Sequence, residues 1–194
     1  MTSTPTTPAT AAGPPLRADA RRNRERLIAT ATKAFTEHGA DAPLEDIARQ
    51  AGVGIGTLYR HFPTRLALQE AVFRTQVETV CQRGRELINE PSPGDAFADW
   101  LHALSSYLGT KRGLSKALIA NLGRDSELIS SCSQIMKSTA EHLLERAQKA
   151  GEVRTDISSM DVMRLVHGIA VASEQTPEDA DRLLSLMIDG LRTS

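Results

Sequence analysis

The sequence predicts an all-α fold. Apolar residues recur at steps of three and four along most of the 194 residues, which is the spacing of one face of a helix. No run of alternating apolar and polar residues is bounded by turn residues, so no strand is expected. Glycine, proline and hydroxyl residues interrupt the helical pattern at short intervals and predict nine helices joined by short connections.

The expected starts and stops of these helices rest on residue chemistry. Gly52 suits a tight turn with positive φ, and Thr64 suits the N-cap of a long helix. Gly109 is expected to end one helix, and Thr176 with Pro177 to begin the last one. The predicted ranges are 17–38, 43–51, 55–62, 65–88, 95–108, 114–122, 126–150, 160–173 and 177–192.

Composition bounds the class of protein. Hydrophobic residues make up 40% of the chain, enough for one large domain or two small ones that share a core. Cys81 and Cys132 show no pairing pattern or metal-ligand spacing, so we expect a reducing compartment and no disulfide, metal or cofactor. No stretch approaches the roughly 18 apolar residues that cross a bilayer. The Thr/Pro/Ala-rich residues 1–16 predict a disordered tail rather than a secretory signal, and the whole chain predicts a cytoplasmic protein without membrane contact.

Charge is unevenly distributed along the chain. The net charge is −1, which alone argues against a nucleic-acid binder. However, residues 17–65 hold nine basic and six acidic residues, a net +3, whereas residues 66–194 hold 14 basic and 18 acidic residues, a net −4. A basic head on an acidic body is typical of a protein that meets DNA on one side only.

Residues 43–65 carry the most informative pattern. A short helix, a glycine-containing turn and a second short helix make up a helix-turn-helix. Leu58 and Phe62 lie four residues apart and are expected to pack inward. The outward positions then carry hydroxyl, guanidinium and imidazole groups that suit phosphates and base edges. The residues expected to contact DNA are Arg22, Gly56, Thr57, Tyr59, Arg60, His61 and Arg65.

The helix-turn-helix resembles that of the TetR family of transcriptional regulators. The resemblance covers about residues 22–71, and its most specific motifs are Asp46-Ile-Ala, Ala51-Gly-Val and Gly56-Thr-Leu-Tyr-Arg-His-Phe. It implies that residues 55–61 form the recognition helix in the major groove. Pro43-Leu44 stands where many members carry a phosphate-binding threonine. The implied architecture has two domains after the tail, a DNA-binding head over 17–64 and a ligand-binding and dimerisation body over 65–194.

The arginines of the first helix allow two interpretations. Those at positions 17, 21, 22, 24 and 26 either form an arm that contacts the minor groove or phosphates, or belong to a solvated helix start. We expect one or two phosphate contacts there, without base readout.

The C-terminal body carries two sets of candidate residues. Polar and aromatic side chains within apolar helices are candidates for a small-molecule cavity. They are Trp100, Tyr107, Asn121, Met136 and His167. The last two helices are apolar over more than one face, which favours a homodimer interface. The residues expected at that interface are Val162, Leu165, Val166, Ile169, Leu183, Leu186 and Met187.

Together with these patterns, the resemblance to the TetR family implies a ligand-responsive regulator that binds a palindromic operator in double-stranded DNA as a homodimer. By the same resemblance, the regulator is expected to be a repressor. One alternative is an all-helical small-molecule-binding protein with a non-functional head. Another is a helical enzyme, but the sequence holds no nucleophile elbow, phosphate-binding glycine loop or zinc-protease motif. No motif in the sequence indicates the identity of a small-molecule effector.

Overall fold

The computed structural model describes residues 14–193, with side chains from residue 17 onward except at 110–112. Of the tail predicted over 1–16, residues 1–13 lie outside this range, whereas residues 14–16 already belong to the first helix. The described residues form eight helices. These are α1 (Pro14–His38), α2 (Leu44–Gln50), α3 (Ile55–His61), α4 (Arg65–Leu87), α5 (Pro93–Leu122), α6 (Glu127–Lys149), α7 (Ser159–Ala172) and α8 (Asp179–Leu191).

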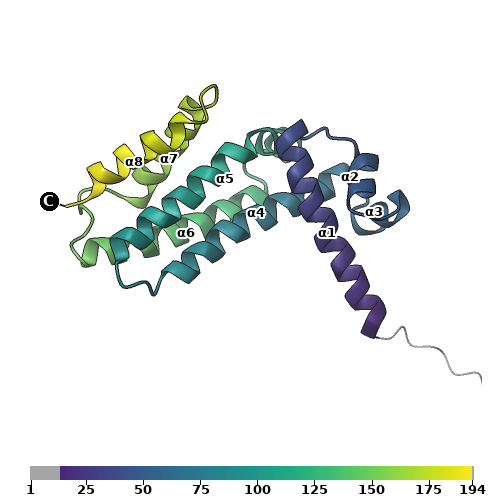
Figure 1. Ribbon diagram of the computed structural model, residues 1–194, viewed down its shortest axis with the longest axis horizontal. Helices are drawn as coiled ribbons and strands as arrows, with labels where there is room; N and C mark the ends of the chain where they lie inside the picture. The colour runs from purple at the N-terminus through teal and green to yellow at the C-terminus, as the bar shows by residue number, and fades with distance from the viewer. Residues whose placement is uncertain (1–13, 194) are drawn as a thin grey trace, which may run out of the picture.

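The all-α prediction is confirmed, and Figure 1 shows how the helices are arranged. The short helices α2 and α3 lie at one end of the molecule, beside α1. Helix α4 leads from that end into an elongated body, where it packs against α5 and α6. Helices α7 and α8 lie at the other end, on the outer side of α5. Helix α5 therefore reaches both ends and contacts α1, α4, α6, α7 and α8.

The two helices predicted over 95–108 and 114–122 are one continuous helix, α5, which accounts for eight helices rather than nine. Gly109 does not end a helix, because the buried face continues across it. Leu104, Tyr107, Leu114 and Leu118 are all buried and lie on one side at helical spacing. Burial of this face outweighs the roughly 1 kcal/mol that a glycine costs inside a helix.

Other boundaries follow the predicted chemistry. The Thr64 hydroxyl accepts a hydrogen bond from the Ala67 amide at 3.0 Å, which confirms it as the N-cap of α4. Gly52 has a φ of +68°, as the turn before α3 requires. The start of α8 differs, because Pro177 lies in a turn and the helix begins at Asp179. An isolated antiparallel bridge between Val153 and Arg192 fastens the C-terminal end to the α6–α7 connection.

The closest helix contact lies where α4 meets α5 and α6. Trp100 of α5 is fully buried, and its indole N–H donates to the Val80 carbonyl at 3.1 Å. Gly84 of α4 faces it, and a β-carbon at Gly84 would lie 2.3 Å from the Thr139 methyl of α6 and 3.2 Å from the Trp100 ring. Only a glycine lets the three helices approach this closely.

This packing predicts opposite effects for two glycine substitutions. Gly84→Ala should lower the free energy of unfolding by about 1–3 kcal/mol, because the added methyl overpacks the junction. Gly109→Ala should raise it by up to about 1 kcal/mol, because this helical glycine has open space around it and alanine favours a helix. Thermal and urea denaturation of the three proteins measure both effects. A destabilised Gly109→Ala variant would contradict the continuous α5.

Candidate nucleic-acid interface

The helix-turn-helix is held together by its own apolar core. Ile47 of α2, Leu58 of α3 and Leu27 of α1 are fully buried, and Phe62 is nearly so. Between the two short helices, the Val53 amide donates to the Ala48 carbonyl at 3.0 Å across the turn at Gly52. The prediction that Leu58 and Phe62 point inward is therefore confirmed. The rest of α3 is left to face solvent.

The outward strip of α3 carries the predicted contact residues. Tyr59 is 45% exposed although it is aromatic, Arg60 is exposed, and Thr57 and His61 are half-buried. Gly56 is exposed, with no neighbouring atom within 4 Å of the place a β-carbon would occupy. Side chains and backbone at this strip are thus open to an incoming partner. Hydroxyl, guanidinium and imidazole groups gathered on one short helix suit phosphates and base edges.

Arg65, at the start of α4, has a role that the sequence did not reveal. Its Nη1 atom donates to the Ala42 carbonyl at 2.6 Å and to the Ala40 carbonyl at 3.3 Å. Gln69, one turn later, is 4% exposed and donates to the same Ala40 carbonyl at 2.9 Å. These bonds tie α4 to the α1–α2 connection, so at least one N–H of Arg65 is engaged within the chain.

The basic residues of α1 make different kinds of contact within the chain. Arg22 is exposed and pairs with Asp19 one turn before it. Arg26 donates to the Asn23 side chain at 2.5 Å. The guanidinium of Arg24 lies 5.4 Å from the centre of the Phe62 ring, a cation–π distance. From the sequence, Arg24 was recognised only as one of several basic residues of the first helix. Its contact with a ring 38 positions away leaves no local signal in the sequence.

The predicted cavity residues fall into two groups. Trp100, Tyr107 and Met136 are buried in the body, and burial raises the pKa of the Tyr107 phenol. Asn121 is exposed at the end of α5, where its amide donates to the Ala117 carbonyl at 2.7 Å, and His167 is exposed on α7. The five side chains are therefore not gathered around one cavity.

A hollow of about 510 Å³ opens beside one of the buried residues. Tyr107 lines it together with Thr32 of α1 and with Gln76 and Val80 of α4. This hollow lies where the helix-turn-helix end meets the body. It is the place where the described chain brings a predicted cavity residue next to space for a small molecule.

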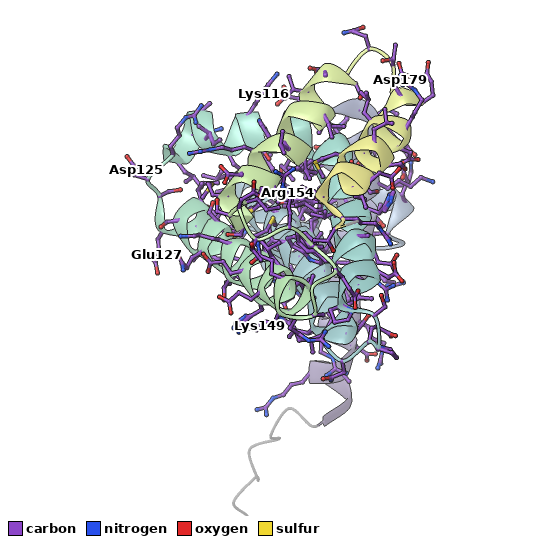
Figure 2. All side chains as sticks on the ribbon, turned by 90° about the vertical axis from the view of Figure 1, so that its left-hand side faces the viewer. Lys116, Asp125, Glu127, Lys149, Arg154 and Asp179 are labelled. Atoms are coloured by element: carbon purple, nitrogen blue, oxygen red, sulfur yellow. The ribbon has the colours of Figure 1, made fainter. Side chains whose placement is uncertain are left out.

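The predicted dimer residues also divide by face. Val162 and Val166 are buried within the chain, where α7 packs against α5 and α6. Leu165 is 49% exposed and Leu186 is 60% exposed, and three further members of the set are half-buried. Those three are Ile169, Leu183 and Met187. Figure 2 looks onto the end of the molecule where α7 and α8 lie, and the two helices face the viewer.

A two-helix head with a solvent-facing strip, set on a helical body, defines a helix-turn-helix DNA-binding protein. Residues 27–72 match the family described as bacterial regulatory proteins of the tetR family. Residues 92–193 match the C-terminal domain of SbtR-like transcriptional regulators. The chain belongs to the TetR family of transcriptional regulators, and the predicted resemblance is confirmed.

Known relatives agree with this assignment over nearly the whole chain. The crystal structure of the TetR regulator SCO0520 of Streptomyces coelicolor is 40% identical with a TM-score of 0.78, and the match covers 88% of this chain and 99% of that one. A TetR regulatory protein of Mycobacterium vanbaalenii is 34% identical with a TM-score of 0.75, covering 92% and 100%. The regulator UidR of Escherichia coli is 25% identical over 191 residues, covering 92% and 97%.

Two further properties of the described residues concern membrane and metal sites. No helix among them has the length and hydropathy needed to cross a membrane. No group of three or more histidine, cysteine, aspartate or glutamate residues in the described part of the chain is placed to hold a metal ion.

The contacts of Arg65 predict an effect on stability in the absence of DNA. Arg65→Ala should lower the free energy of unfolding by about 1–2 kcal/mol, because it removes hydrogen bonds from two loop carbonyls. The matched control is Arg60→Ala, an exposed arginine of α3 whose loss should leave unfolding unchanged within about 0.5 kcal/mol. Equal melting curves for the two variants would assign Arg65 to DNA contact alone.

Proposed function

We propose that this regulator is a homodimeric repressor that binds an inverted-repeat operator through α3 and leaves it when a small-molecule effector binds the body. The observation that carries the proposal is the exposed strip of α3, where Tyr59 and Arg60 face solvent beside Thr57 and His61. A tyrosine 45% exposed offers its hydroxyl and its ring to a partner, which suits a contact made only in a complex.

Dimerisation is supported by the outer side of α7 and α8. Leu165 and Leu186 are large apolar side chains that are 49% and 60% exposed, whereas Val166 and Leu184 on the same two helices are fully buried. Helices that are apolar on two sides must bury both, and a second copy supplies the missing surface. A twofold axis through this face places two heads on one side of the DNA, where recognition helices meet successive major grooves about 34–36 Å apart.

Effector control is supported by the way the helices are shared. Helix α4 is tied to the head by Arg65 and Gln69, and it also lines the hollow beside Tyr107. A ligand that binds one arrangement of α4 better than another shifts the population of head positions. The protein then acts by binding alone, without enzymatic turnover, metal or cofactor, in the cytoplasm where its operator lies.

The recognition helix is tested by replacing its exposed groups. The double variant Tyr59→Ala, His61→Ala should abolish the electrophoretic shift of the DNA upstream of the protein's own gene, because the removed groups supply contacts to bases and phosphates. Size-exclusion chromatography should show the same oligomer as the unchanged protein. A retained shift would reject α3 as the recognition helix. Glu45→Ala, an exposed change on α2, is the matched control and should leave the shift intact.

The dimer face is tested by a charge. Leu186→Glu should give monomers in light scattering, because two buried carboxylates would face each other across the twofold axis. Ile135→Glu is the matched control, since Ile135 is also a large apolar residue, 44% exposed, on α6. That variant should keep the mass of the unchanged protein. A Leu186→Glu variant of unaltered mass would place the interface elsewhere.

A further inference from the structure

A long groove runs along α4, where the N-terminal half of α1 leaves the body (Figure 1). Its volume is about 840 Å³. It spans α4 from Ala71 to Glu86, about 22 Å at 1.5 Å per residue. Helix α1 contributes Arg24, and the start of α6 contributes Ser131, Cys132 and Ile135. The groove therefore touches both the head and the body.

The end of the groove nearest the head carries positive charge. Arg24 and Arg74 line it from two different helices, and neither forms an ion pair within the described chain. The acidic residues further along are already compensated, because Glu78 pairs with Arg85 and Glu86 pairs with Arg83 at 3.8 Å. Two guanidinium groups without carboxylate partners are a site for an anion, which arginine binds with paired hydrogen bonds.

The wall between α4 and α6 is apolar. Val77 and Cys132 are buried at its base, and Ile135 is a large apolar side chain left 44% exposed at its edge. A ligand with an anionic group at one end and an apolar chain would cover these apolar side chains with its chain. Its anionic group would then contact the arginines. From this pairing we propose that the groove binds a small amphipathic carboxylate, whose anionic group bridges Arg24 and Arg74 and whose apolar part lies against Val77 and Ile135.

This assignment rests on the proposed function and gives its effector a chemical class. It places the effector in this groove, which shares Thr75, Thr79 and Arg83 of α4 with the hollow beside Tyr107. Arg24 is the link to DNA binding, because its guanidinium also lies over Phe62, the buried residue that ends α3. A carboxylate that draws Arg24 into the groove removes the cation from that ring. The end of the recognition helix loses a contact, so the anion and the operator oppose each other's binding by the same factor.

Calorimetry with three probes of equal chain length tests the site. Decanoate should bind the dimeric full-length protein, whereas decanol and decyltrimethylammonium should bind at least about tenfold more weakly, because an anion–guanidinium pair is lost. Arg24→Ala and Arg74→Ala should each weaken decanoate about tenfold. Arg21→Ala should bind as the unchanged protein, since Arg21 lies on α1 outside the groove and faces Glu25.

The binding measurements distinguish the proposed carboxylate site from its absence. Equal binding of decanoate and decanol, or decanoate binding that survives the loss of both arginines, would overturn it. Arg74 is exposed, so its replacement should leave folding intact, and the effect of Arg74→Ala stands if Arg24→Ala lowers the melting temperature. Ile135→Ser should weaken decanoate several-fold by removing apolar cover.

A gel shift separates this proposal from the proposed function. Decanoate should weaken the operator complex of the unchanged protein and leave that of Arg74→Ala nearly unaffected. A protein that shifts DNA but ignores decanoate keeps the proposed function and loses the carboxylate site. A protein that binds decanoate through Arg74 but shifts no DNA keeps the site and loses the proposed function.

Discussion

The attachment of α4 to the head by Arg65 and Gln69 is the interaction on which the rest of the arrangement depends. Their side chains satisfy the carbonyls of Ala40 and Ala42, which belong to the connection between α1 and α2. A carbonyl left without a partner in a buried place costs about 1–3 kcal/mol. These bonds link α4 to the head, so that a shift of α4 in the body would be passed to the surface that carries α3.

The same connection is approached from the body by a second helix. A β-carbon at Gly113 of α5 would lie 3.9 Å from the backbone of Gly39 and Ala40. Helices α1, α4 and α5 also share one continuous apolar core, in which Leu27, Leu68 and Leu118 are fully buried. Head and body are thus joined by packing on one side and hydrogen bonds on the other. Such a junction favours a few discrete arrangements over continuous bending.

The sequence allowed prediction of those features that depend on short-range patterns. The turn at Gly52, the cap at Thr64 and the inward side of α3 follow from spacing within a few residues, and the structure agrees with each. The continuous α5 was missed because Gly109 is a local stop signal, whereas the buried face that overrides it is formed by packing against five other helices.

The candidate sites show the same limit. Periodicity marked Val166 and Leu165 alike as apolar, but only packing separates the residue buried within the chain from the one left for a partner. The bonds of Arg65 to the loop and the contact of Arg24 with Phe62 join residues 23 to 38 positions apart, at distances where a single sequence carries no signal. Asn121 and His167 looked unusual in apolar helices and are exposed instead.

The lengths of α4 and α5 explain why a ligand near the head suits a regulator of this shape. The 30 residues of α5 extend about 45 Å and connect the neighbourhood of α1 with the outer helices α7 and α8. In the proposed dimer these outer helices are fixed by the partner, so the heads are the ends that can move. A small rotation where α1 crosses α4 and α5 then becomes a larger displacement of α3 relative to its copy. In the proposed complex, operator binding requires one separation of the two recognition helices, so an occupant at that crossing would change the fit to DNA.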